Sequence, residues 1–235
     1  MEKLFALDHI LLWVDKDAPE MEFFKENGFT GIISGSHSSQ GTSGKYLFFL
    51  NFYIELLYIS DPVEAYANIE KFGCNYMERS NWRSNHASPF GLALKMETFD
   101  KEKVLFDYTE YKAGWMKDDG LLMADHNKNL SAPLVFVLRP KMEFPCYHSM
   151  DEMRMDHKPE DFKKNHIHEN GIETLTSYHV YLNPEVETSG LVNCLNTGGI
   201  NILKGDENRI ELIFDHGINN KEIDFRPGLP LIIKY

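Results

Sequence analysis

The sequence predicts an α+β fold in which a βαβββ module is repeated and helices cover the outer faces of the sheets. Short apolar runs of strand length alternate with helical segments that end at glycine, and this order begins three times, near residues 7, 90 and 174. The chain has 235 residues, of which 43% are hydrophobic, and this is enough to bury one shared core. We therefore expect related modules joined side by side.

The first module is predicted to span residues 1–61. Its first strand is LDHILLWV, and a helix follows from Asp17 to Asn27, with Asp17 and Glu20 at capping-box spacing and a glycine stop. The segments GFTGIIS, GKYLFFLN and FYIELLYI are typical of three further strands. The loop SHSSQGT lies between the first two of these, and a serine- and glycine-rich turn does not need the imidazole of His37 to reverse the chain.

A connecting segment and a second module are predicted next. Residues 62–87 should contain a helix that starts with proline, is capped by Asp61 and ends at glycine. The second module, residues 88–140, should contain the strand FGLALKM, a helix from Phe99 to about Tyr111, and the strands GLLMADHN and APLVFVLRP.

The last part of the chain is predicted to be an irregular connector and a third unit. Residues 141–172 form the connector, with one short helix after Pro159. Its histidines match no spacing of a known metal site, so we expect exposed loop histidines at His148, His157, His166 and His168. Residues 173–235 form a partial βαβββ-like unit with the strand TLTSYHVYL, a helix capped by Asn183 with Pro184 as its first residue, and the strands NRIELIFDHG and LPLIIKY.

Charge and cysteine content argue against several classes of partner. The chain has 24 Lys and Arg against 36 Asp and Glu, and the resulting charge of -12 repels nucleic acid and anionic membranes. The apolar segment LFALDHILLWV is interrupted by Asp8 and His9, so it predicts neither a signal peptide nor a membrane span. Cys74, Cys146 and Cys194 are odd in number and far apart, which predicts free thiols and a cytoplasmic protein.

Strand alternation places polar groups on otherwise apolar walls. His9 shares a face of the first strand with Leu11 and Trp13, and Glu55 shares a face of the fourth strand with Leu57. A sheet that is apolar on both sides needs another layer or a ligand on each of them. A carboxylate buried there without a partner is strongly destabilising, so Glu55 needs a neighbour, and His9 is the expected one.

The first module resembles the glyoxalase-like domain of the vicinal oxygen chelate superfamily. The resemblance rests on an LDH-type first strand, a short helix ending in GF, a loop that contains H and GT, and a strand with an IEL core. It implies paired modules whose curved mixed sheets surround a cleft that holds metal and substrate. His9 and Glu55 match the family's metal-ligand positions, whereas the second module has Gly91 at the corresponding place and no acidic residue in APLVFVLRP.

The resemblance implies one divalent metal ion, which could be Zn, Ni, Mn or Fe. Its ligands would be His9, Glu55 and, from the third unit, His179. A site without metal is the alternative, in which His9 and Glu55 form a hydrogen-bonded pair and His179 is a core histidine. Glu211 in NRIELIF is a further acidic group near the strand of His179.

The resemblance also gives His37 a place at one end of the cleft. Glu55 and His37 are the candidate catalytic residues, and the alternative for His37 is a solvated turn in which it points outward. Replacing His37 by alanine is expected to weaken binding in the cleft and to leave the melting temperature nearly unchanged. The candidate substrate contacts are Trp13, Thr42, Phe48, Tyr53 and Arg139.

Two classes of function follow from these residues. The first is an enzyme of lyase, isomerase or dioxygenase type that acts on a small oxygenated metabolite. The second is a non-catalytic protein that binds a small molecule in the same cleft. In either case the expected partner is a small molecule, with no nucleic acid or membrane, and a homodimer is possible.

Overall fold

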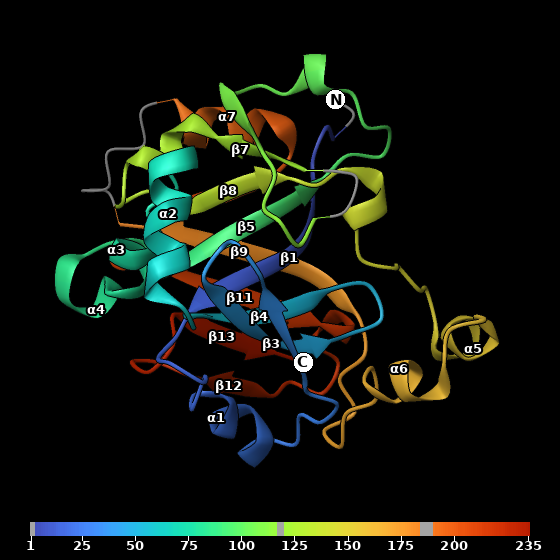
Figure 1. The fold of residues 1–235 in the computed structure, drawn as a ribbon. Helices are drawn as coiled ribbons and strands as arrows, with labels where there is room; N and C mark the ends of the chain where they lie inside the picture. Colours follow the sequence, from blue (N-terminus) through green and yellow to red (C-terminus); the bar gives the residue numbers. More distant parts are fainter. Residues whose placement is uncertain (1–2, 117–119, 184–189) are drawn as a thin grey trace.

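A computed structural model describes residues 3–116, 120–183 and 190–235 (Figure 1). The first βαβββ module is continuous within it, and its strands lie in the order β2-β3-β4-β1. The elements of this module are β1 (Ala6–Trp13), α1 (Met21–Glu26), β2 (Ile33–His37), β3 (Thr42–Phe48) and β4 (Tyr53–Ile59). Strand β1 pairs in parallel with β4, and Leu11 lies opposite Glu55. This confirms that the strands of His9 and Glu55 are neighbours.

The second module extends the same sheet. Its strands are β5 (Phe90–Lys95), β6 (Tyr108–Tyr111), β7 (Leu121–Ala124) and β8 (Leu134–Val137). The strand order is β5-β8-β7-β6, with β5 parallel to β8, and β5 pairs with β1 in antiparallel fashion. The two modules therefore share one sheet of eight strands, joined edge to edge as the sequence predicted.

The helix predicted from Phe99 to Tyr111 is wrong. Asp100 caps only one 3₁₀ turn, Lys101–Lys103, and the backbone at Val104 is already extended. The residues that follow form β6, which pairs with β7. Pairing with a strand from a later segment overrides the local helical pattern here.

Of the two helices predicted in and just after the first module, one has the predicted bounds and the other begins later than predicted. Helix α2 (Pro62–Phe72) is confirmed, because the Asp61 carboxylate accepts from two backbone amides of the first turn and Gly73 ends the helix with a φ of 72°. Helix α1 begins four residues later than predicted. Glu20 does not close a capping box, since its carboxylate accepts from the Asp15 amide at 3.1 Å and from Arg83 at 2.9 Å. The short helices α3 (Tyr76–Ser80) and α4 (Trp82–Asn85) follow α2.

The third unit forms a separate sheet of five strands. Its elements are β9 (Leu175–Leu182), α7 (Leu191–Gly198), β10 (Ile202–Lys204), β11 (Arg209–Phe214), β12 (Glu222–Asp224) and β13 (Leu231–Lys234). The order β10-β9-β11-β13-β12 differs from that of the first module. Helix α7 begins well after the predicted start, and Pro184, predicted as its first residue, lies outside the described residues.

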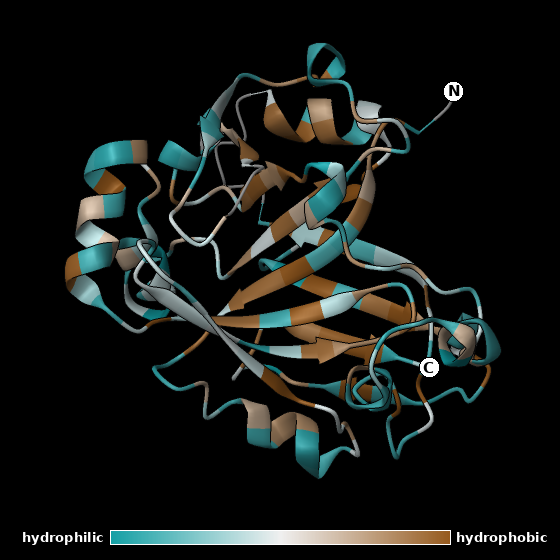
Figure 2. Cartoon of the chain, turned by 45° about the vertical axis from the view of Figure 1, so that its right-hand side comes forward, coloured by the Kyte–Doolittle hydropathy of each residue, from teal (hydrophilic) through white to brown (hydrophobic). Residues whose placement is uncertain are grey.

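The eight-stranded sheet is buried on both faces. On one face Ile10, Ile54 and Leu92 join a core with Val180 and Leu212 of the five-stranded sheet. On the other face a second apolar cluster includes Leu11, Leu57 and Phe136. Figure 2 shows the hydrophobic residues along the central strands and hydrophilic ones on the peripheral helices. The alternation read from β1 and β4 thus separates a structural face from the face that bears His9 and Glu55.

The connector holds two short helices and two buried histidines. Helix α6 (Glu160–Lys164) follows Pro159 as predicted, and α5 (Met150–Met155) precedes it; both lie apart from the sheets in Figure 1. The prediction of exposed histidines is wrong for His166 and His168, which are buried. His168 accepts from the Thr30 amide at 3.2 Å through Nδ1 and donates to the Phe48 carbonyl at 2.9 Å through Nε2. It therefore joins the connector to the first module.

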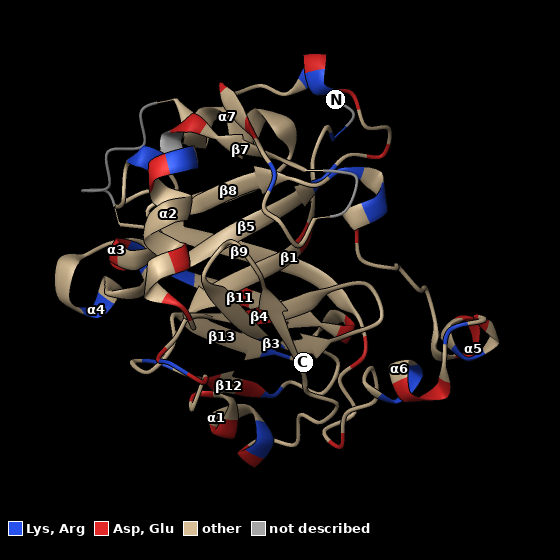
Figure 3. Cartoon of the chain, viewed as in Figure 1, with Lys and Arg blue, Asp and Glu red and all other residues tan. Residues whose placement is uncertain are grey.

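Charged residues lie mainly on the helices and outer loops (Figure 3). Within the ranges 3–116, 120–183 and 190–235, no helix has the length and apolar character needed to cross a bilayer.

The three cysteines give a test of the thiol prediction. All three are unpaired: Cys74 is buried, Cys146 is exposed and Cys194 is half-buried. Burial raises the pKa of the Cys74 thiol to about 11. We expect thiol titration of unreduced protein to find three thiols after denaturation and, in the native state, rapid reaction at Cys146 and slow reaction at Cys74. Finding one thiol in the denatured protein would contradict the prediction.

Candidate active site

A cavity of about 310 Å³ lies on the second face of the eight-stranded sheet, between the two modules. The first module supplies most of its polar groups, namely His9, His37, Gln40, Tyr46, Tyr53 and Glu55, and Tyr76 and Lys141 of later segments also line it. The second module supplies an apolar wall, made by Leu121, Met123, Leu134, Phe136 and Leu138. The arrangement is an apolar pocket with a few converging polar groups, as expected of a small-molecule site.

Glu55 is the most unusual group in this cavity. Its side chain is 8% exposed, and its Oε1 atom is buried without a hydrogen-bond partner. The nearest imidazole atom is Nε2 of His37, at 3.6 Å. Burial raises the pKa of Glu55 to about 7, although a hydrogen bond from Tyr46 opposes this shift. The carboxyl group can therefore release or accept a proton near neutral pH.

The structure places His37 in the cavity and not in solvent. Strand β2 ends at His37, whose Nδ1 lies 2.9 Å from the Thr42 hydroxyl and whose Nε2 lies 2.8 Å from the Tyr46 hydroxyl. Burial, aided by the nearby His9, lowers the pKa of His37 to about 4. His37 is therefore neutral at pH 7. The expectation that His37 is within reach of the pocket of His9 and Glu55 is confirmed.

His9 has a different partner from the one predicted. Its Nδ1 lies 2.8 Å from a carboxylate oxygen of Asp8, the preceding residue, and its Nε2 lies 3.1 Å from the Tyr53 hydroxyl. The rings of His9 and Tyr53 are stacked, with centroids 4.0 Å apart. Burial lowers the pKa of His9, against the effect of Asp8. The predicted hydrogen-bonded pair of His9 and Glu55 is thus absent: His9 pairs with Asp8, and Oε1 of Glu55 lies 3.6 Å from His37 without a hydrogen bond between them.

Of the predicted substrate contacts, only Tyr53 lines the cavity. Thr42 is fully buried behind His37, and Trp13 is fully buried with its ring against Tyr76. Phe48 packs on the rings of Tyr53 and Phe144.

Arg139 lies away from the cavity lining. It pairs with Glu110 at 3.1 Å and covers the ring of Phe99. Arg139 follows the end of β8, and these contacts hold its guanidinium outside the pocket.

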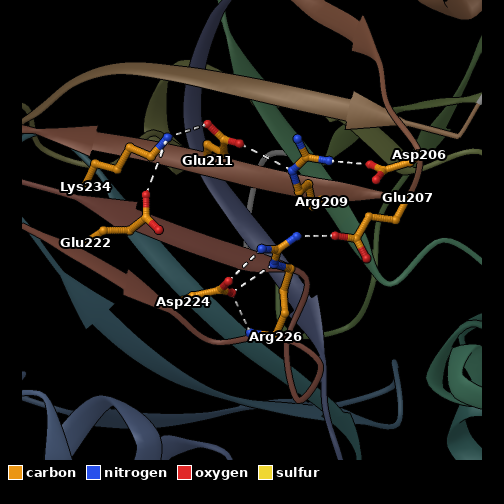
Figure 4. Close-up of polar contacts among 8 residues, drawn as sticks. All are labelled: Asp206, Glu207, Arg209, Glu211, Glu222, Asp224, Arg226 and Lys234. Atoms are coloured by element: carbon orange, nitrogen blue, oxygen red, sulfur yellow. Dashed lines mark hydrogen bonds and ion pairs between the residues drawn. The ribbon is translucent and has the colours of Figure 1, made fainter.

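His179 does not join His9 and Glu55, because its strand β9 belongs to the five-stranded sheet. It lies opposite Glu211 of β11, and Glu211 is held by Arg209 at 3.3 Å and Lys234 at 3.0 Å. Figure 4 shows these groups within a network of ion pairs across β11, β12 and β13. The neighbouring cations lower the pKa of Glu211, although burial opposes them. Glu211 is therefore a structural carboxylate.

The predicted metal shell is not assembled by these side chains. In the described part of the chain, no group of three His, Cys, Asp or Glu side chains is arranged to hold an ion. Nε2 of His9 and Nε2 of His37 each lie within hydrogen-bond distance of a tyrosine hydroxyl, and the second module turns apolar side chains to the cavity. A catalytic metal usually has three protein ligands. The divalent ion stays a prediction.

Sequence reasoning missed Asp8 and Gln40. Gln40 lines the cavity and its amide nitrogen donates to the Thr42 hydroxyl at 2.9 Å. It lies within the loop SHSSQGT, where its position beside the GT pair was the available signal. Regular alternation puts Asp8 on the opposite face from His9, and it does not include the irregularity of β1 described below.

A larger and more open cavity, of about 770 Å³, lies where the first residues of β1 approach the first residues of β9. Lys95, Glu143 and Tyr178 are among its lining residues. None of His9, His37 and Glu55 lines it. The smaller cavity is the better candidate for chemistry, since it gathers the buried titratable groups with shifted pKa values.

The burial of His37 changes the expected result of its replacement. Its side chain is 11% exposed and has two polar partners, so we expect His37→Ala to lower the free energy of unfolding by about 1–3 kcal/mol. Urea denaturation at pH 7.5 measures this loss. The exposed neighbour Ser38 provides the control, because Ser38→Ala should change stability by less than about 0.5 kcal/mol. Equal stability of the two variants would contradict the burial of His37.

The chain is similar to one protein family and to solved structures. The glyoxalase-like domain family matches the chain over residues 7–118. The crystal structure of a hypothetical protein from Staphylococcus aureus is similar over 98% of this chain and 99% of its own, with a TM-score of 0.57 and 13% identity. A xylose isomerase-like TIM barrel/4-hydroxyphenylpyruvate dioxygenase fusion protein is similar over 89% of this chain and 36% of its own, with a TM-score of 0.42 and 12% identity.

No curated protein matches the chain. The likeness to the Staphylococcus aureus protein supports the fold, and the family match covers the module that carries His9, His37 and Glu55. Residues 7–118 therefore match the glyoxalase-like domain family, and the chain as a whole shares its fold with the Staphylococcus aureus protein.

Proposed function

We propose that the protein is an enzyme that transfers a proton within a small, largely apolar, oxygenated molecule, as an isomerase or lyase does. The observation that supports this most is the unpartnered Oε1 of Glu55, buried against a cavity with an apolar wall. An isolated carboxylate is costly at such a place, and enzymes keep such groups where they act as acids or bases.

In this proposal Glu55 is the general base. With a pKa of about 7, an appreciable fraction of Glu55 is ionised at neutral pH, and it remains basic enough to remove a proton next to a carbonyl. Tyr46 and His37 lie beside the carboxyl group and can return or relay the proton. The apolar wall excludes water and strengthens these interactions.

His9 and Tyr53 stand at the other polar part of the cavity and would orient an oxygen of the ligand. The hydroxyl of Tyr53 approaches Nε2 of a His9 ring on which it is stacked, so both groups present polar atoms from adjacent strands β1 and β4. Burial raises the pKa of Tyr53 well above its ordinary value, so its hydroxyl is a donor at any working pH.

The test uses solvent deuterium as a probe of proton transfer. Wild-type protein is incubated in D₂O with a panel of small ketones and hydroxyketones, and loss of the C–H signal next to the carbonyl is followed by ¹H NMR. We expect exchange with at least one compound and a loss of about 10²- to 10⁴-fold in its rate in Glu55→Gln. The exposed Glu22 provides the control, since Glu22→Gln should exchange at the wild-type rate.

The other outcomes separate the remaining hypotheses. A compound that binds in the cavity without exchange would support the non-catalytic binding protein. Exchange that begins only after addition of Mn²⁺, Fe²⁺, Ni²⁺ or Zn²⁺ would support the predicted divalent ion, with His9 and Glu55 as its expected ligands. Exchange at an equal rate in Glu55→Gln and wild type would overturn the role of Glu55.

A further inference from the structure

The two histidines of the cavity belong to two hydrogen-bond networks whose donors and acceptors can be assigned. The first begins with Asp8, which is fully buried. Successive side chains of a strand normally point to opposite faces, so Asp8 and His9 should not meet. Strand β1 is irregular at this point, because Leu7 pairs with Leu94 and His9 with Ala93, which leaves Asp8 as an extra residue. This bulge brings the carboxylate to the imidazole of the next residue.

The carboxylate of Asp8 fixes which nitrogen of His9 carries the proton. Its Oδ1 lies 2.8 Å from Nδ1 of His9, while its Oδ2 accepts from the Phe144 amide at 3.0 Å and lies 3.4 Å from Nζ of Lys95. An ionised carboxylate only accepts hydrogen bonds, so Nδ1 of His9 must be the donor. The neutral ring then has a free lone pair on Nε2, the nitrogen nearest the Tyr53 hydroxyl.

The second network runs from Gln40 to His37. The indole nitrogen of Trp115 and the hydroxyl of Tyr111 donate to Oε1 of Gln40, at 3.1 and 2.8 Å. An indole nitrogen can only donate, so this contact identifies the amide oxygen of Gln40 and directs its nitrogen to the Thr42 hydroxyl. Thr42 accepts that bond, which leaves its own proton available to Nδ1 of His37, at 2.9 Å.

The consequence for His37 is the opposite of that for His9. Because Nδ1 of His37 accepts from Thr42, the neutral ring carries its proton on Nε2. This Nε2 lies 2.8 Å from the oxygen of Tyr46 and 3.6 Å from Oε1 of Glu55. Thr42, His37 and Tyr46 therefore form a directed chain of hydrogen bonds that ends beside the carboxyl group of Glu55.

We infer that Asp8 and the Gln40–Thr42 pair are positioning residues that hold the two neutral histidines of the cavity in opposite tautomers, Nδ1–H in His9 and Nε2–H in His37. This inference deepens the proposed function, on which its catalytic meaning rests. It gives the cavity one imidazole that accepts at Nε2 and one that donates at Nε2. The test of this inference measures tautomers and not activity, so the inference and the proposed function can be contradicted independently.

The experiment is a long-range ¹H–¹⁵N correlation spectrum of ¹⁵N-labelled full-length protein at pH 7.5. The ring signals of His9 are assigned by their contact with the Tyr53 ring, 4.0 Å away, and those of His37 by their loss in His37→Gln. We expect a protonated Nδ1 in His9 and a protonated Nε2 in His37 in the wild type. The same tautomer in both rings, or a doubly protonated ring, would overturn the inference.

Variants test which residues set the tautomers. In Asp8→Asn the amide oxygen should turn to the Phe144 amide and Lys95, which are two donors, and its nitrogen should face His9. We therefore expect the protonated and unprotonated ring nitrogens of His9 to exchange places. Asp15→Asn, at an exposed aspartate of the same module, should leave the spectrum of His9 unchanged. An unchanged tautomer in folded Asp8→Asn would overturn the role of Asp8.

Thr42 offers a matched pair of variants that preserves the shape of the side chain. Thr42→Val removes the donor and should release His37 from the pure Nε2–H form, whereas Thr42→Ser keeps the hydroxyl and should retain that form. Both variants keep a small side chain at this buried position. They therefore test whether Thr42 sets the tautomer of His37 even if Asp8→Asn does not fold. A His37 spectrum that is the same in the valine and serine variants would overturn the role of Thr42.

Discussion

Above pH 7, Glu55→Gln is expected to be more stable than the wild-type protein, by up to roughly 3 kcal/mol. The reason is the cost of an ionised carboxylate at a buried site, which raises the pKa of Glu55 from its ordinary 4.5 to about 7. The folded protein therefore binds one more proton than the unfolded chain between these two values. The wild-type free energy of unfolding should fall as pH rises from 4.5 to 7 and then level off, whereas glutamine has no charge to bury.

Urea denaturation of the two proteins at pH 4.5 and pH 8 measures this effect. The advantage of the variant should be present at pH 8 and be largely lost at pH 4.5, where both forms of the side chain are uncharged. Glu22→Gln, at an exposed position, should show no such dependence. A Glu55→Gln protein that is less stable than wild type at both pH values would contradict the raised pKa. If Glu55→Gln gains stability and loses proton exchange, Glu55 supports the activity of the site and lowers the free energy of unfolding.

Arg79→Met is expected to lower the free energy of unfolding by roughly 3–5 kcal/mol. Arg79 is fully buried in α3, and its guanidinium donates to three backbone carbonyls. These belong to Ala132 at 2.8 Å, Asn127 at 2.8 Å and Asn129 at 3.0 Å. Burial lowers the pKa of Arg79 to about 10, so the group remains charged at neutral pH. Methionine fills a similar volume but leaves all three carbonyls without this donor.

The effect should reach the cavity as well as the global stability. Asn127 pairs with the backbone of Val135 on β8, at 2.9 and 3.0 Å, and β8 supplies Leu134 and Phe136 to the apolar wall. Thermal and urea unfolding measure the loss of stability. Arg154→Met is the control, because the exposed side chain of Arg154 pairs with Asp151 of its own helix. A similar small change in both variants would contradict the structural role of Arg79.

Some features of the fold follow from short stretches of sequence. The boundaries of α2 were correct because the Asp61 cap and the Gly73 stop act within a few residues of the helix ends. The common orientation of His9 and Glu55 was correct because side chains alternate along a strand, whatever the partner strand is. The failure at β6 has the opposite cause, since its strand pairing with β7 depends on residues ten or more positions later.

In the candidate site too, some features follow from local sequence and others depend on tertiary contacts. The sequence by itself determined that an imidazole on β1, a carboxylate on β4 and His37 at the loop would belong to one module, because their order and spacing are local properties of the chain. Only the tertiary structure decided their partners. A bulge turned Asp8 to His9, the β2–β3 hairpin brought His37 to Glu55, and sheet assembly placed His179 elsewhere. Such contacts depend on strand register and on the packing of distant segments, and a local pattern does not specify either of them.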